Sequence, residues 1–379
     1  MKLETFSYTK EEGWSIETFP DLDSEQTLIL IFAAPEMIQD LTPLQELSRQ
    51  YPLSKMMGCS SAGEIYGSQI HDKSLSVAIA CFEHTPLQIV KANLTNMEES
   101  FTIAEQLAEQ LKRTDLKGVL VLSEGLLVNG SELVKGLSSA LGENVVITGG
   151  LAGDGVQYKD TWTIYEGEIL KNHIIAVGFY GDHIQMGWAS RGGWDIFGPE
   201  RYITRSKGNI LYELDGKPAL ELYKQYLGEK STGLPATGLF FPLAIRANES
   251  DEKQLVRTIS AVNEEDQSLT FAGDVPMGYL AQLMRGNFDR LIASAGNAGE
   301  VALNNNESTG PILCVAISCV GRRVLLGERT EEETEAVLES LPLGTKQVGF
   351  YSYGEIAPMI KGTCDFHNQT MTLTTLYEK

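Results

Sequence analysis

Two short loops of the chain share one pattern, and their residues could bind a ligand or act on one. Gly58–Ile65 reads GCSSAGEI and Gly349–Ile356 reads GFYSYGEI, so both follow G-x-x-S-x-G-E-I. A glycine-rich loop after a strand presents backbone N–H groups and allows close approach of a ligand. The spacing resembles that of a phosphate-binding loop, but Glu64 and Glu355 stand where that motif requires lysine. Because a carboxylate repels phosphate, we do not expect these loops to bind nucleotides.

The first loop also contains a candidate nucleophile, Cys59. The sequence GCSSA lacks the second glycine of a nucleophile elbow, because Ala62 occupies that position. A cysteine nucleophile needs a base, and the best distant candidate is His367. A cysteine at the end of a strand also occurs in a purely structural role. An enzyme of acyl or amide transfer that uses Cys59 is therefore one alternative, and a structural cysteine is the other.

Acidic residues end three glycine-containing loops. Glu64 and Glu355 end the two loops above, and Asp154 ends the sequence LAGD, where Ala-Gly-Asp takes the place of Ala-Gly-Glu. Carboxylates beside glycine amides would suit a small zwitterion such as an amino acid, whose own carboxylate could pair with Arg191. The alternative is that each acid accepts hydrogen bonds from the backbone of its own loop. The candidate ligand-binding residues are Cys59, Ser60, Ser61, Glu64, Gly150, Asp154, Arg191, Tyr353, Glu355 and His367.

The five histidines are the imidazoles that could bind a metal or haem. No two of them have the spacing of metal ligands, and the chain lacks the C-x-x-C-H motif of covalent haem attachment. His71 and His367 each begin a predicted strand, where a histidine more often bonds to the backbone. Because a single axial ligand leaves no motif, haem binding through one histidine is an open alternative.

The order of predicted elements near the N-terminus recurs near the C-terminus. Each copy has a buried strand, a helix, a short strand leading into the G-x-x-S-x-G-E-I loop, and a closing strand. HDKSLSV after the first loop matches HNQTMTL after the second. A weaker third copy lies between them, with predicted strands at 118–124 and 161–165 around a helix at 130–141. The sequence predicts an α/β fold with mixed sheets, built pseudo-symmetrically from duplicated β-α-β-loop-β units.

The length of 379 residues predicts two domains. The segment 205–216 separates two series of predicted strands and precedes a helix at 216–228, in which Pro218 occupies the first turn. We therefore predict an N-terminal domain of residues 1–205 and a C-terminal domain of residues 206–379.

The composition restricts the class of partner. With 51 acidic and 30 basic residues, the formal charge of −21 disfavours nucleic acid and anionic membranes, which both attract positive surfaces. The five cysteines are scattered and odd in number, which is typical of buried thiols in a reducing compartment. The N-terminal sequence MKLETFSYTKEEGW has no apolar signal core, and no apolar stretch is long enough to span a bilayer. We expect a cytoplasmic protein without membrane insertion.

Five segments occur in order along the chain: GCSSAGEI, GGLAGDG, ITRSKGNILYELDGKPALELY, GFYSYGEIAP and HNQTMTL. Together they resemble the FIST family, named for F-box and intracellular signal transduction proteins, whose members pair an N-terminal with a C-terminal FIST domain. The resemblance runs from about Thr27 to Leu376. It implies a sensory module with amino acids as proposed ligands. The resemblance also implies that a subset of the family, similar to the nitric-oxide-sensing haemoproteins, binds haem and modulates a partner histidine kinase.

We therefore predict a sensory protein that binds an amino-acid-like ligand in a cleft lined by the glycine–acid loops. The chain has no room for an attached kinase or cyclase, so we expect it to signal in trans to such a protein. A haem-binding nitric-oxide sensor that regulates a histidine kinase is the first alternative, and the Cys59-dependent enzyme is the second. The resemblance adds no catalytic residue and does not identify a haem ligand.

Overall fold

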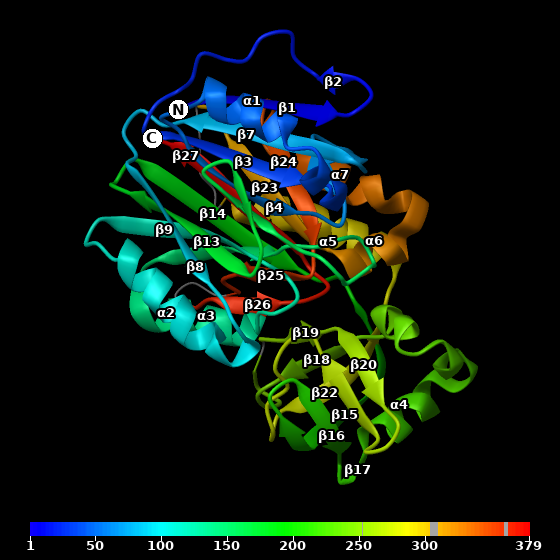
Figure 1. Ribbon diagram of the computed structural model, residues 1–379. Helices are drawn as coiled ribbons and strands as arrows, with labels where there is room; N and C mark the ends of the chain where they lie inside the picture. The colour runs from blue at the N-terminus through cyan, green and yellow to red at the C-terminus, as the bar shows by residue number, and fades with distance from the viewer. Residues whose placement is uncertain (252, 304–309, 360–362) are drawn as a thin grey trace.

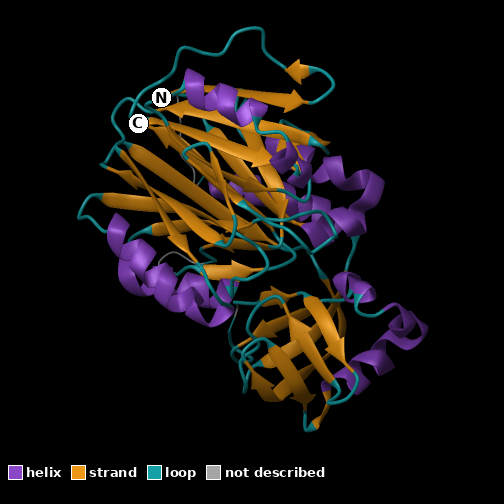
Figure 2. Cartoon of the chain, viewed as in Figure 1, coloured by secondary structure: helices purple, strands orange, loops and turns teal. Residues whose placement is uncertain are grey.

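The computed structural model describes residues 1–251, 253–303, 310–359 and 363–379. Its strands form four sheets, and helices cover the outer faces of these sheets (Figures 1 and 2). Three sheets make up a large body, and the fourth, called the small sheet below, lies beside one end of the body (Figure 1). Within the described ranges, no helix is long and apolar enough to cross a membrane.

Three units with one order of elements build the body. The first unit consists of β1 (Lys2–Thr9), β2 (Gly13–Trp14), β3 (Thr27–Ala33), η1 (Pro35–Gln39), α1 (Thr42–Gln50), β4 (Lys55–Ser60), β5 (Glu64–Tyr66), β6 (Gln69–His71) and β7 (Ser74–Cys81). The second consists of β8 (Leu87–Asn93), η2 (Met97–Glu99), α2 (Ser100–Leu111), β9 (Leu116–Ser123), α3 (Gly130–Leu141), β10 (Val146–Leu151), β11 (Thr163–Tyr165), β12 (Glu168–Leu170) and β13 (His173–Tyr180). The third consists of β14 (Ile184–Arg191), α5 (Phe288–Ala302), β23 (Leu313–Cys319), α6 (Val320–Leu326), η5 (Gly327–Arg329), α7 (Thr330–Glu339), β24 (Lys346–Ser352), β25 (Gly354–Ala357), β26 (Asp365–His367) and β27 (Met371–Glu378).

The small sheet is inserted into the third unit between β14 and α5. Its elements are β15 (Asp195–Lys207), β16 (Ile210–Leu214), β17 (Lys217–Pro218), α4 (Ala219–Leu227), η3 (Gly228–Gly233), η4 (Ala236–Phe240), β18 (Leu243–Arg246), β19 (Leu255–Arg257), β20 (Ile259–Asn263), β21 (Ser268–Phe271) and β22 (Leu280–Arg285). The predicted domain boundary at residues 205 and 206 falls within β15, and the division into two domains there stays a prediction.

The units exchange their short hairpins in a cycle. In each unit two parallel strands enclose a helical connection, namely β3 and β4, β9 and β10, and β23 and β24. The hairpin β5–β6 pairs with β24, the hairpin β11–β12 pairs with β4, and the hairpin β25–β26 pairs with β10. Each body sheet therefore contains strands of two units. The predicted α/β fold with mixed sheets from repeated units is confirmed, and the weak third copy is a full unit of a pseudo-three-fold body.

One core fills the centre of this body, because the parallel strands are apolar on both faces. Along β3, Leu30 and Phe32 face the central core, whereas Ile31 packs under α1. The other two units send equivalent residues inward, so that Phe350 of β24 stacks on Phe32 with ring centroids 4.9 Å apart. The helices α2 and α3 cover the outer face of the sheet that contains β8, β9, β10 and β13 (Figure 1).

The first glycine of the shared loop pattern is required by the approach of the two parallel strands. Gly58, Gly149 and Gly349 occupy equivalent positions on β4, β10 and β24. A Cβ atom at Gly58 would lie 2.0 Å from the carbonyl oxygen of Ile31, and a Cβ atom at Gly149 or Gly349 would lie 1.8 Å from a carbonyl oxygen of the neighbouring strand. No other residue fits at these three positions without moving a strand.

We expect the substitution Gly349→Ala to lower the free energy of unfolding by at least about 2 kcal/mol, because the added methyl group overlaps the backbone of β23. Thermal and urea unfolding would measure the loss. The matched control is Gly296→Ala in α5, whose Cβ would lie 3.4 Å from its nearest neighbour and which improves helix propensity. Equal melting temperatures for the two variants would contradict the steric explanation.

Candidate functional site

The three loops that carry the predicted site residues meet at the centre of the body. The backbone N–H of Ala62 donates to the Tyr351 carbonyl at 2.8 Å, and the N–H of Tyr351 donates to the Gly63 carbonyl at 2.9 Å. The N–H of Gly153 donates to the Ser60 carbonyl at 3.1 Å. The two loops with the sequence Gly-Glu-Ile and the LAGDG loop therefore contact one another directly.

The acids of the first and last loops bond to the turns that follow them. Glu64 Oε2 accepts hydrogen bonds from the backbone N–H and hydroxyl of Ser74 at 3.1 and 2.9 Å. Glu355 Oε2 accepts from the same groups of Thr370, also at 3.1 and 2.9 Å. Both carboxyl groups are buried, and burial raises the pKa of each to about 8. The backbone donors belong to the turn after the next hairpin and not to the acid's own loop, so each acid ties its loop to that later turn.

Asp154 has a different position from the one that the sequence comparison assigned to it. Thr163 of β11 lies opposite Cys59 of β4, and Glu64 of β5 lies opposite Phe350 of β24. Cys59 and Phe350 occupy equivalent positions, because each directly follows the first glycine of the loop pattern. Thr163 therefore occupies in the second unit the position that Glu64 occupies in the first. Asp154 lies instead in a longer loop before β11. Its carboxylate accepts hydrogen bonds from the backbone N–H groups of three later residues at 2.8 Å each and from the Tyr353 hydroxyl. The expected equivalence of Ala-Gly-Asp with Ala-Gly-Glu is wrong, because the second unit has the longer loop.

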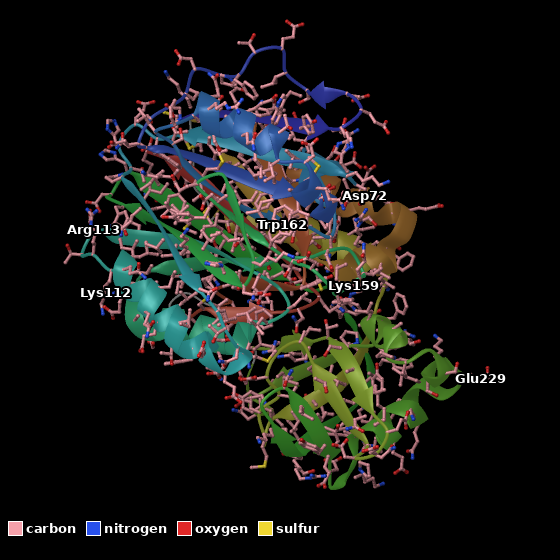
Figure 3. The ribbon with its side chains drawn as sticks, viewed as in Figure 1. Asp72, Lys112, Arg113, Lys159, Trp162 and Glu229 are labelled. Atoms are coloured by element: carbon pink, nitrogen blue, oxygen red, sulfur yellow. The ribbon has the colours of Figure 1, made fainter. Side chains whose placement is uncertain are left out.

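The remaining predicted residues of the first loop have their polar atoms inside the fold. Cys59 is fully buried, and burial raises the pKa of its thiol well above the ordinary value. The Ser60 hydroxyl accepts from the N–H of Trp162, which lies inside the body (Figure 3). The Ser61 hydroxyl accepts from the N–H of Gly63 at 2.8 Å.

Of the other three predicted residues, Gly150 and His367 lie on the two strands that flank Glu355 and pair with it from either side, whereas Arg191 lies apart. Gly150 is buried on β10, where a Cβ would lie 2.9 Å from the side chain of Ile317. Arg191 ends β14 and donates to the carbonyl of Ser190. His367 is buried on β26, and its Nε2 lies 2.9 Å from the carbonyl oxygen of Ala357. Arg191 therefore does not join the contacts among the three loops, whereas His367 is the strand neighbour of Glu355.

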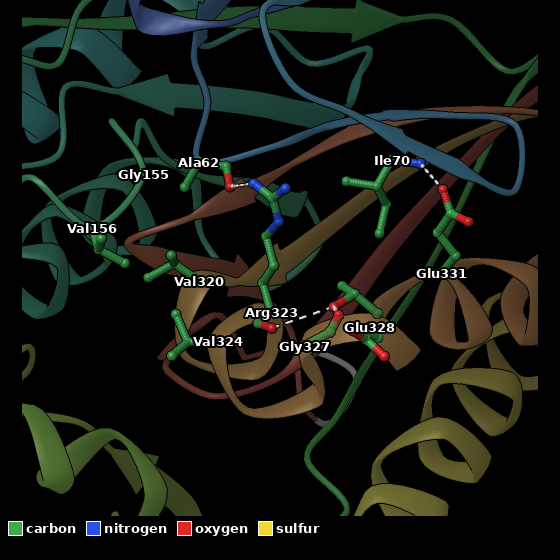
Figure 4. A pocket seen from close by; sticks show the side chains of 11 residues that line it. Ala62, Ile70, Gly155, Val156, Val320, Arg323, Val324, Gly327, Glu328 and Glu331 are labelled. Carbon is green, nitrogen blue, oxygen red and sulfur yellow. Dashed lines mark hydrogen bonds between the residues drawn. The ribbon is translucent and has the colours of Figure 1, made fainter.

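A hollow of about 480 Å³ opens beside the first loop (Figure 4). All three units border it, and the residues that line it are Ala62, Ile70, Gly155, Val156, Val320, Arg323, Val324, Gly327, Glu328, Thr330 and Glu331. None of the ten residues predicted from sequence is among them. The walls combine four aliphatic side chains with one cation and two carboxylates, a mixture that suits a small ligand with both charges.

Arg323 of α6 is the central charged group of this hollow. Its Nη1 donates to the Ala62 carbonyl at 2.5 Å, a contact drawn in Figure 4. Its two terminal nitrogens also pair with both carboxylate oxygens of Asp72 at 2.9 and 2.8 Å. Asp72 is 67% exposed and lies at the surface of the body (Figure 3). A Cβ at Gly63 would lie 2.5 Å from Arg323, so the second glycine of the loop makes room for the guanidinium.

A buried ion pair holds the helices that carry this wall. Arg322 and Glu333 are both fully buried, and Arg322 Nη2 lies 2.7 Å from Glu333 Oε2. The hydroxyl groups of Ser318 and Tyr351 donate to the other carboxylate oxygen at 2.9 and 2.7 Å. These bonds fix α6 and α7 against β23 and β24. This ion pair was not predicted from the sequence. The signal that could have indicated it is the pair of arginines, Arg322 and Arg323, that follows the buried strand ILCVAISCV.

Family models match the two halves of the chain. The FIST N domain matches residues 27–217, and the FIST C domain matches residues 219–358. The chain belongs to the FIST family. The FIST N match runs from β3 of the first unit through the second unit, β14, β15 and β16 to the start of β17, and the FIST C match runs from α4 to β25 of the third unit. FIST domains are sensory domains of signal transduction. The FIST resemblance expected from the loop sequences is thereby confirmed.

This FIST chain is also similar to the uncharacterized protein MJ1623 of Methanocaldococcus jannaschii. The two sequences are 23% identical over 367 residues, which cover 88% of this chain and 69% of the relative.

We expect Glu64 and Glu355 to make the stability of this FIST protein fall as the pH rises. Their pKa values lie near 8 in the folded protein and near the ordinary 4.5 in the unfolded chain. The stability from these protonated groups is complete below about pH 4.5 and is lost as the pH rises through about 8. Urea unfolding at several pH values would measure this loss.

The matched variant is Glu64→Gln combined with Glu355→Gln, because glutamine keeps the shape and cannot ionise. Its stability should decline less between about pH 5 and about pH 8 than that of the wild type. Other groups, including His367, titrate in both proteins. The difference between the two stability profiles therefore reports on Glu64 and Glu355. Parallel pH profiles would exclude the assigned protonation.

Proposed function

We propose that this FIST protein is a cytoplasmic sensor that binds an amino-acid-like ligand in the hollow beside the first loop. The observation that carries the proposal is the pairing of Arg323 with an exposed acid. A planar guanidinium binds a carboxylate through two parallel hydrogen bonds, and Asp72 now fills that position. A ligand carboxylate of the same geometry can replace it.

The opposite wall offers groups for the ammonium end of such a ligand. Glu328 and Glu331 line the hollow, and one oxygen of Glu331 accepts from the N–H of Ile70. The aliphatic side chains of Val320, Val324 and Val156 line the hollow on the other side of Arg323 and suit an apolar ligand side chain (Figure 4). The first loop contributes the Ala62 carbonyl and the space at Gly63, while its acidic side chain supports the turn behind it.

Ligand binding would change the surface in a defined way. Asp72 lies in the turn between β6 and β7, and displacement of its carboxylate from Arg323 would release this turn from α6. A partner such as a histidine kinase or a cyclase that contacts this surface would then receive the signal in trans. The net charge of −21 argues against a nucleic acid as the partner. The five cysteines are all unpaired, which supports a cytoplasmic location.

A thermal-shift screen of free amino acids tests the proposed site. We expect at least one amino acid to raise the melting temperature of the wild type in a saturable way. The variant Arg323→Gln should lose this response. The variant Asp72→Asn removes the competing carboxylate, so its affinity should rise by up to about fivefold, the scale of an exposed ion pair. Equal affinities of wild type and Arg323→Gln would reject the site.

The two alternative functions have weaker support. A haem sensor needs an imidazole that faces a cavity, but no histidine lines the hollow, His367 bonds to a carbonyl, and His84 and His183 lie at the surface with ring centroids 4.7 Å apart. These residues do not fit haem. For an enzyme, Cys59 is buried with a raised thiol pKa and lies in a different sheet from His367.

We expect the purified protein to develop no Soret band that shifts with nitric oxide after haem is added. The physical reason is the lack of an imidazole that is both available and directed into a cavity. Absorption spectroscopy with a stoichiometric amount of haem would check this result. A shifting band that disappears in His367→Ala would favour the haem alternative over the proposed function.

A further inference from the structure

A second hollow lies where the small sheet meets the body. Its volume is about 280 Å³, and its walls come from α3, β18, β19, β26 and the loop after β21. Figure 1 shows β19 of the small sheet next to β26 of the body. The hollow beside the first loop shares no lining residue with this one.

Arg257 is a buried cation at the wall of this second hollow. Its side chain belongs to the last residue of β19 and is only 4% exposed. Its Nε donates to the Asp274 carbonyl at 2.8 Å, and its Nη1 donates to the carbonyls of Val256 and Phe366 at 3.1 and 3.0 Å. These bonds use three of the five N–H groups of the guanidinium. The two N–H groups of Nη2 have no acceptor among the residues that the structure describes.

No carboxylate of the described residues lies within ion-pair distance of Arg257, although the charges of Asp274 and Asp365 are near enough to act on its pKa. Both of these aspartates pair with lysines, since Asp274 pairs with Lys135 at 3.0 Å and Asp365 pairs with Lys253 at 2.5 Å. A third carboxylate of the hollow, Asp251, accepts from the backbone N–H of Lys253 at 2.9 Å. Burial lowers the pKa of Arg257 to about 10, which still leaves it protonated at neutral pH. The buried Arg322, in contrast, has Glu333 as a full ion-pair partner. A buried cation with no carboxylate at ion-pair distance is unfavourable, and an anion in the adjoining hollow would remove this penalty.

The residues around Arg257 also connect the small sheet to the body. Phe366 of β26, whose carbonyl accepts from Arg257, packs against three glycines, and a Cβ at Gly130, Gly273 or Gly354 would lie within 2.3 to 2.9 Å of its ring. These glycines belong to α3, to the loop after β21 and to β25. An anion held by Arg257 would therefore touch the point at which the small sheet is attached.

We propose that this second hollow binds a small oxyanion, a carboxylate or phosphate group, with Arg257 as its charge partner. The two N–H groups of Nη2 donate to the anion, and the protonated guanidinium supplies the positive charge. The volume limits the ligand to a small molecule. This site is independent of the hollow at Arg323, and its occupation ties the small sheet more firmly to α3 and β26.

Thermal unfolding of the full chain in sodium phosphate or sodium succinate, against sodium chloride at equal ionic strength, tests the proposal. We expect at least one of the two anions to raise the melting temperature in a saturable way. The larger response identifies the preferred oxyanion. The substitution Arg257→Gln should lower the affinity for this anion at least about tenfold, the factor expected for a lost charge-assisted hydrogen bond. No saturable rise with either anion would overturn the proposal.

Two further variants separate this site from the proposed amino-acid site. Arg323→Gln and Asp72→Asn should leave the response to phosphate and succinate unchanged, whereas Arg257→Gln should leave the response to amino acids unchanged. An anion response that survives in Arg257→Gln and disappears in Arg323→Gln would show that the anion binds in the first hollow. That result would overturn the proposal of a second site.

Hydrogen exchange of the wild type covers the case in which Arg257→Gln does not fold. A bound anion should slow the exchange of amides in β19, in β26 and in the loop at Gly273 and Asp274. Protection that is confined to other segments would overturn the proposal. If Arg257 only ties the small sheet to the body through its three carbonyl partners, neither anion will change exchange in these segments.

Discussion

The cyclic exchange of hairpins is the constraint on which the rest of the structure depends. A strand of three or four residues, such as β5 or β25, has too few hydrogen bonds to be stable alone. Each of these strands pairs with the second parallel strand of another unit, and glycines at 58, 149 and 349 let the two parallel strands lie close together. No unit can complete its sheet by itself. The three loops must then meet at the centre, because each of them connects a strand to an exchanged hairpin.

This arrangement explains why the loop acids lie inside the protein. Glu64 and Glu355 follow strands that are covered on both sides, so their carboxyl groups face the turns at Ser74 and Thr370 and not solvent. Burial raises the pKa of both to about 8, which keeps them largely protonated at neutral pH. The groups that reach the open hollow are the backbone of the first loop and the side chains of α6 and α7, which the ion pair of Arg322 with Glu333 holds in place.

The third unit differs from the other two because it carries the small sheet. The turn between β26 and β27 contacts this sheet, since the Gln369 amide donates to the carbonyl of Leu239 and Trp194 donates to the carbonyl of Gln369. The same turn bonds to Glu355 through Thr370. The centre of the body, the turn and the small sheet thus form one continuous set of contacts. A ligand at either hollow would act on one end of this set.

The sequence by itself determined the repeated elements and the family. Buried strands such as β3 read as continuous apolar runs, and the paired motifs identified the repeat and the FIST resemblance, because these signals are local along the chain. The tertiary structure decided which hairpin completes which sheet, that Thr163 and not Asp154 holds the place of Glu64, and that Arg323 faces a hollow. It also decided that Arg257 is buried with no carboxylate of the described residues at ion-pair distance. These properties depend on contacts between residues far apart in sequence, such as Ala62 with Arg323, and burial and ion pairing follow from those contacts alone.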